Sequence, residues 1–178
     1  MNADEELAEL LHWSDEFRPK LSWQEVEPIV GVGFPEDFKR FASRFPSGAF
    51  PGGFYFYSPI QSHDSLNEFR LTWTSHLDFL ARVRERLPRD APYPLFPEAG
   101  GIIPWALGDE HVYYWATDAA RPDDWTVVFH DAGLDWGAYP GPASSFVLEM
   151  ITGTFKHPCL YYQPGDDEMT FHPYGRFL

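Results

Sequence analysis

The spacing of hydrophobic residues changes near residue 100, and this change most constrains what the chain can fold into. Before it, apolar side chains recur three or four residues apart, which is the period of a helix with one buried face. After it, apolar and polar residues alternate in short runs, which is the period of a β-strand. A chain of 178 residues has the length of one ordinary domain. Helices followed by strands therefore predict a single α+β layered domain over 1–178.

Five segments have the features of helices. A capping box, Ser22-Trp23-Gln24-Glu25, opens the second, which ends at Gly31. Pro35 opens the third, in which Phe34, Phe38, Phe41 and Phe45 form an apolar stripe. The fourth is long, and we allow for a break near 72–75. We expect helices at 4–13, 23–30, 35–45, 66–87 and 143–152.

Short runs of alternating residues, bounded by Gly, Pro and Asp, have the features of strands. The segment 108–110, Gly-Asp-Glu, is suited to a hairpin turn between two of them. Apolar pieces in the tail are expected to be edge strands. We expect strands at 54–57, 101–107, 111–116, 125–130, 160–162 and 169–171. The predicted core includes Phe38, Phe41, Trp105, Val127 and Phe129.

Acidic residues outnumber basic ones by 27 to 13, for a formal charge of -14. Such a surface repels phosphate backbones and anionic lipids, so nucleic acid and membranes are poor partners and a basic protein is favoured. The excess is concentrated after residue 89, where three basic residues stand against thirteen acidic ones. Net charge also promotes solubility, which is the alternative explanation of the acidic excess.

The sequence also indicates the cellular compartment in which the protein is expected. Its only cysteine, Cys159, rules out an internal disulfide and suits a reducing environment. The first thirteen residues are acidic where a signal peptide would be basic, and no apolar run reaches the length of a membrane span. We therefore expect a cytoplasmic protein.

No known catalytic or metal-binding motif occurs in the sequence. Its seven histidines are scattered without ligand spacing, and it contains no phosphate-binding loop or nucleophile elbow. His157 and Cys159 would share one face of a strand, which permits a Cys–His pair, although a core or edge cysteine is the preferred interpretation. We predict no catalytic residue, no metal site and no cofactor.

Four segments, in order, resemble the SUKH superfamily, which includes fungal cell-wall-assembly regulators and bacterial immunity proteins. The resemblance covers about 22–152 and does not extend past residue 153. The segments are Phe-Pro-Glu-Asp-Phe-Lys-Arg-Phe at 34–41, Ile-Ile-Pro-Trp-Ala-Leu-Gly-Asp-Glu at 102–110, His-Val-Tyr-Tyr-Trp-Ala-Thr at 111–117 and Pro-Asp-Asp-Trp-Thr-Val-Val-Phe at 122–129.

This resemblance implies a twisted antiparallel sheet with helices packed against it, without cofactor or catalysis. For bacterial members it implies an immunity protein that binds and neutralises a cognate toxin, which the acidic charge suggests is basic. An intracellular scaffold or signalling adaptor, like the fungal relatives, is the alternative. An enzyme is the third and least favoured class.

The candidate partner-binding residues lie in turns between the predicted strands. Acidic turns between strands could dock a basic partner, and the alternative is a solvated loop face. Tryptophan is a frequent interface anchor, but Trp105 and Trp125 at strand ends are expected in the core. Trp136 follows the strands in a Gly- and Pro-rich loop. The candidates are Asp109, Glu110, Asp123, Asp124, Asp135 and Trp136.

Overall fold

Seven antiparallel strands form one open sheet in the computed structural model, which describes residues 1–14, 17–165 and 167–175. The spatial order is β6-β5-β4-β3-β2-β1-β7, so only β7 departs from chain order. The strands are β1 (Gly48–Phe50), β2 (Phe54–Phe56), β3 (Ile102–Gly108), β4 (His111–Ala116), β5 (Thr126–Asp131), β6 (Trp136–Tyr139) and β7 (His172–Pro173). The predicted single-domain α+β fold with an antiparallel sheet is confirmed.

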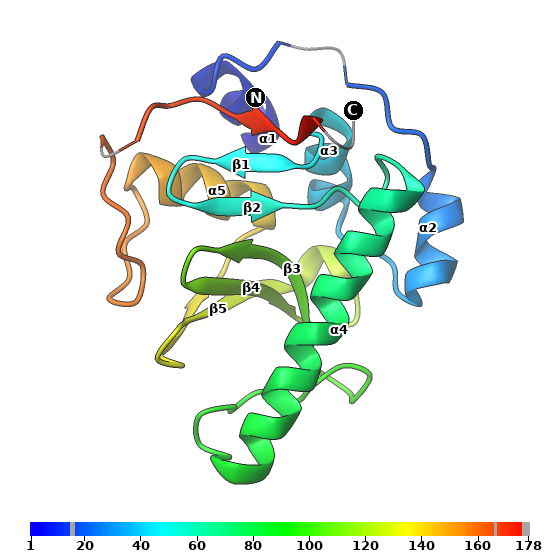
Figure 1. Cartoon of the computed structure of the whole chain (residues 1–178), viewed down its shortest axis with the longest axis vertical. Coiled ribbons are helices and arrows are strands. Elements are labelled where there is room, and N and C mark those ends of the chain that lie inside the picture. The colour runs from blue at the N-terminus through cyan, green and yellow to red at the C-terminus, as the bar shows by residue number, and fades with distance from the viewer. Residues whose placement is uncertain (15–16, 166, 176–178) are drawn as a thin grey trace.

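The described part of the chain has five helices around this sheet. In Figure 1, α4 crosses the near face, and α1, α3 and α5 lie behind the strands. No helix in the described part of the chain is both long and apolar enough to cross a membrane. The helices are α1 (Ala3–Leu10), α2 (Trp23–Val30), α3 (Glu36–Arg44), α4 (His63–Arg86) and α5 (Ala143–Thr152).

Helix starts follow the predicted local chemistry. The Ser22 hydroxyl accepts a hydrogen bond from the Glu25 amide at 3.3 Å, and the Glu25 carboxylate accepts one from the Ser22 amide at 2.7 Å. This capping box satisfies amides that have no partner within the helix. A distant residue caps α3, because the Glu36 amide donates to the Asp123 carboxylate at 2.7 Å. All five predicted helices are present, and α4 runs without a break.

The sheet is buried on both faces, so two apolar clusters form. Alternation along β4 and β5 sends Trp115, Val127 and Phe129 into the main cluster under α1, α3 and α5. The intervening Tyr114 and Val128 enter a second cluster under the C-terminal half of α4. The five predicted core residues are all buried, as are Trp115 and Trp125.

The structure departs from the strand predictions at four places. Strands β1 and β6 were not expected, and β6 contains Trp136, which the sequence placed in a loop. No strand forms at 160–162 or at 169–171. The tail strand is instead the two-residue β7, just beyond the second predicted segment. Pro158 and Pro164 flank the first segment and cannot donate to a ladder, which disfavours a strand there.

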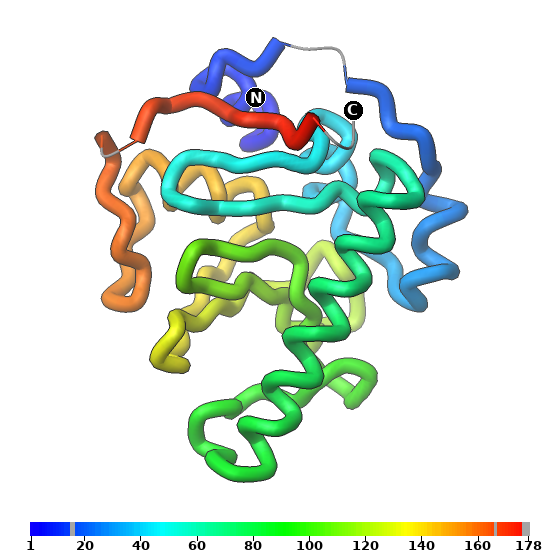
Figure 2. Tube along the Cα trace, in the orientation of Figure 1, coloured from blue at the N-terminus to red at the C-terminus, as the bar shows by residue number. Residues whose placement is uncertain are grey.

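The chain after α5 forms a strap along one end of the sheet. Figure 2 shows it descending on the left and then returning to the top, where β7 pairs with β1. The His111 ring contacts the Cys159 carbonyl, and the Gly52 amide donates to Asp167 at 2.9 Å. The strap therefore links strand ends that are far apart in the sequence.

Candidate partner-binding surface

Three chain reversals and the strap meet at one end of the sheet, which we call the turn end. It comprises the turns 51–53, 109–110 and 132–135 together with the strap residues 157–165 and Asp167. The strand register places these turns at the same end, because Phe54 pairs with Gly108 and His111 pairs with Asp131. An antiparallel meander returns to the same end at every second connection. Residues separated by more than 100 positions thus share one surface.

The turn end gathers three of the five acidic candidates. Asp109, Glu110 and Asp135 are exposed in its turns. The strap adds Asp167, which binds the Gly52 amide. The Tyr55 hydroxyl donates to Asp109, and this hydrogen bond raises the pKa of Tyr55, with a smaller contribution from the Asp167 charge. The carboxylates of Asp109 and Asp167 therefore both raise the pKa of Tyr55.

The other two candidates lie at the opposite end of the sheet. Asp123 and Asp124 belong to the short 3-10 helix Pro122–Asp124, which precedes β5 where Thr126 pairs with Ala116. The six residues of β5 span about 20 Å. Asp123 caps α3 and Asp124 pairs with Arg121 at 2.8 Å, so both already have partners within the chain. The five acids therefore do not form one docking patch.

Trp136 is half-buried within the second apolar cluster. Its indole Nε1 donates to the Asp90 carbonyl at 2.8 Å, and its ring packs on His130 with centroids 4.7 Å apart. The ring of Tyr114 lies on the same indole at 5.7 Å. These contacts give Trp136 a structural role, and we leave it out of the proposed surface.

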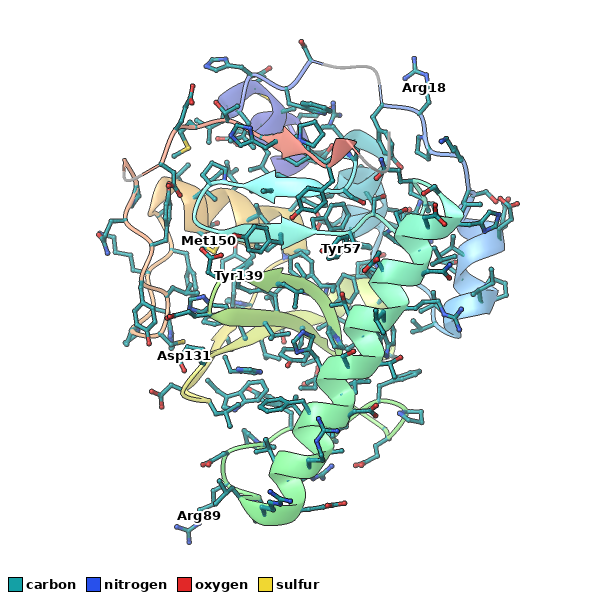
Figure 3. The ribbon with its side chains drawn as sticks, in the orientation of Figure 1. Arg18, Tyr57, Arg89, Asp131, Tyr139 and Met150 are labelled. Atoms are coloured by element: carbon teal, nitrogen blue, oxygen red, sulfur yellow. The ribbon has the colours of Figure 1, made fainter. Side chains whose placement is uncertain are left out.

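Asp131 is the buried carboxylate at the turn end. Its side chain accepts hydrogen bonds from the Tyr161 hydroxyl and from the backbone amides of Gly133, at 2.9 Å, and Asp135, at 3.0 Å. Burial alone would raise the pKa of Asp131, but these hydrogen bonds outweigh it and the pKa lies below its usual value. Figure 3 shows Asp131 at the left of the sheet, far from Arg89 at the lower tip. The β5–β6 turn is therefore held by an ionised group.

A groove of about 430 Å³ opens between α4 and the turns β3–β4 and β5–β6. Its larger apolar lining residues are Phe79, Leu107, Val112 and Leu134. Its polar lining includes the acids Asp109, Glu110 and Asp131 and the imidazoles of His76, His111 and His130. Two predicted candidates, Asp109 and Glu110, thus border a concave apolar surface that the sequence did not indicate.

His130 lies almost wholly buried at the base of this groove. Its Nδ1 contacts the Asp131 carbonyl at 2.8 Å, which only a donor can do, so Nε2 accepts from the Tyr114 hydroxyl at 2.9 Å. The neutral ring satisfies both contacts. Burial lowers the pKa of His130 and also that of His76, which faces it across the groove region.

We expect stability to fall in mild acid because of these two rings. Their folded-state pKa values lie below the ordinary value of 6.5, so the native protein takes up fewer protons than the unfolded chain. Their contribution is present above about pH 6.5 and is lost as the pH falls through the lower folded-state values. Urea denaturation between about pH 7 and pH 5 measures this loss. His76→Gln should reduce the slope, whereas Leu71→Ala, which removes an exposed and non-titrating side chain from the same helix, should leave it unchanged; equal slopes in both variants would contradict the assignment.

Cys159 and His157 do contact each other, with Sγ and Nδ1 2.9 Å apart. The cysteine is buried, and burial, with a smaller contribution from Asp131, raises its pKa to about 11. A thiol that stays protonated is a poor nucleophile, because the thiolate is the reactive form. The pair therefore acts as a structural hydrogen bond within the strap.

Two further searches, for a metal-binding cluster and for similar known proteins, were negative. Across residues 1–14, 17–165 and 167–175, no three His, Cys, Asp or Glu side chains are grouped so as to hold a metal ion. No protein-family model, curated protein or solved structure matches this chain.

Proposed function

We propose that this protein is an immunity protein that binds a basic cognate toxin through the turn end of its sheet and neutralises it by direct contact, without catalysis. The observation that carries the proposal is the gathering of Asp109, Glu110, Asp135 and Asp167 on one surface. No Lys or Arg among the described residues forms an ion pair with these four acids. Their charge is therefore available to a basic partner.

The sequence resemblance to SUKH immunity proteins supports the same function. The turn end is also mechanically suited to binding, since its turns are anchored by the paired strands and by the hydrogen bonds of Asp131. A surface that is fixed before binding loses less conformational entropy when the complex forms. A cytoplasmic location, in which the protein would protect its own cell, belongs to this proposal.

The first test looks for a toxin domain encoded beside this gene and co-expresses that domain with this chain. We expect the chain to restore growth and to co-purify with the toxin. If the wild-type chain does neither, the immunity function is wrong, and the scaffold or signalling adaptor becomes the leading hypothesis.

The second test compares two double variants that each remove two negative charges. Asp109→Asn with Glu110→Gln neutralises the turn end, and Asp118→Asn with Asp124→Asn neutralises exposed acids at the other end. Charges at the edge of an interface mainly accelerate encounter, so the first variant should associate about tenfold more slowly and with a weaker salt dependence. Stopped-flow association at several salt concentrations measures this. Equal slowing by both variants would show that net charge, and not this surface, steers binding.

A further inference from the structure

The groove beside the turn end is bordered by an unusual phenylalanine. Phe79 is 40% exposed, whereas its neighbour Leu80 is fully buried in the second cluster. No other phenylalanine in the described part of the chain is exposed. The sequence places Phe79 on α4, and the structure sets it opposite Leu107, Val112 and Leu134 across the groove. Its exposure leaves apolar surface facing a concavity.

The charges around the groove have one sign. Asp109 and Glu110 are exposed at its border, and the pKa of Asp131, which also lines it, lies below the usual value. No Lys or Arg is among the described residues that line it. The nearby imidazoles of His76 and His130 are kept neutral by burial, which lowers the pKa of both. A cation entering the groove would therefore meet carboxylates and, among the described lining residues, no Lys or Arg; His111 is the one lining imidazole besides these two.

From these observations we infer that the groove receives an arginine or lysine of the partner, flanked by an apolar residue. The aliphatic stem of such a side chain can lie on Leu134 and on the Phe79 ring, and its charged head can reach Asp109 and Glu110. The volume of about 430 Å³ is in the range of sites that enclose one such segment. This inference deepens the proposed function, since it names the part of a basic partner that the turn end recognises.

The experiment uses the full-length chain labelled with ¹⁵N and a defined probe, the peptide acetyl-Gly-Leu-Arg-Leu-Gly-amide. We expect amide shift changes confined to about 75–80, 107–112 and 130–134. The matched peptide with glutamine in place of arginine should bind at least about tenfold more weakly, because it lacks the charge. Shift changes that lie elsewhere, or that are equal for the two peptides, would overturn the inference.

Two variants separate the groove from the rest of α4. Phe79→Ala should weaken binding of the arginine peptide about fivefold, since the ring supplies both apolar contact and cation–π attraction. Leu71→Ala removes a side chain that is 62% exposed two turns earlier on the same helix, and should change binding less than about twofold. Unchanged spectra away from the groove verify that both variants fold. Equal weakening by the two variants, or none by Phe79→Ala, contradicts the inference.

The peptide and toxin experiments test the groove assignment and the immunity function separately. If the toxin is not neutralised but the arginine peptide still maps to the groove, the immunity function is wrong and the recognition of cationic segments stands. If the toxin is neutralised but Phe79→Ala and the peptide have no effect at the groove, the function stands and this assignment is wrong.

Discussion

Replacing Phe38 with alanine is expected to lower the free energy of unfolding by about 3–5 kcal/mol. Phe38 has no exposed surface and lies where α3 meets the sheet. Its ring packs edge-on against Trp115 with centroids 4.7 Å apart, and it also contacts Phe56 at 5.8 Å and Trp105 at 6.1 Å. Truncation loses apolar burial and leaves a cavity lined by large rings, two of which, Trp105 and Trp115, are held by stacking on each other at 5.5 Å.

Urea denaturation monitored by tryptophan fluorescence measures this loss. Leu71→Ala is the control, because Leu71 is 62% exposed on α4 and its truncation should change stability by less than about 0.5 kcal/mol. A loss below about 1 kcal/mol for Phe38→Ala would mean that the aromatic core readily repacks.

Gly101→Ala is expected to destabilise the protein by about 3 kcal/mol through overpacking. A Cβ at this position would lie 2.6 Å from the Leu95 carbonyl carbon and 2.8 Å from the Glu98 carbonyl oxygen, and would also collide with the Phe96 amide nitrogen. All three are backbone atoms of the loop that closes back onto the start of β3, where the Ile102 amide donates to the Pro94 carbonyl at 2.8 Å. The loop must move as a unit to admit a methyl group.

Gly33→Ala is the matched control for this variant. The nearest atom to a Cβ there is a Glu27 carboxylate oxygen at 3.8 Å, so a methyl group fits and stability should change by less than about 0.5 kcal/mol. Differential scanning fluorimetry should show a clearly lower Tm for Gly101→Ala alone. Similar Tm values for both variants would show that the loop at 95–101 can move to admit the methyl group without loss of stability.

The sequence by itself determined those helices and strands that are specified by residues close together along the chain. The capping box at Ser22 and the apolar stripe containing Phe38 and Phe41 predict helices correctly, since helical hydrogen bonds and helical faces join residues three or four apart. Alternation likewise predicted β3, β4 and β5, with buried Trp105 and Phe129. Strands β1, β6 and β7 are four residues long or shorter and were not predicted, whereas the equally short β2 was predicted from its aromatic run at 54–57. Strands this short form because partner strands supply their hydrogen bonds.

Tertiary structure alone decided which acids share a surface. In the sequence, Asp109, Asp123 and Asp135 appear as equivalent turn residues. The antiparallel reversal at each strand sends Asp123 to the far end, where it caps α3, and keeps Asp109 and Asp135 together at the turn end. The strap then returns Asp167 to the same place. The register of the strands and the path of the strap are set by pairing and packing between residues far apart in the sequence. No local pattern could therefore have predicted the turn end or the groove beside Phe79.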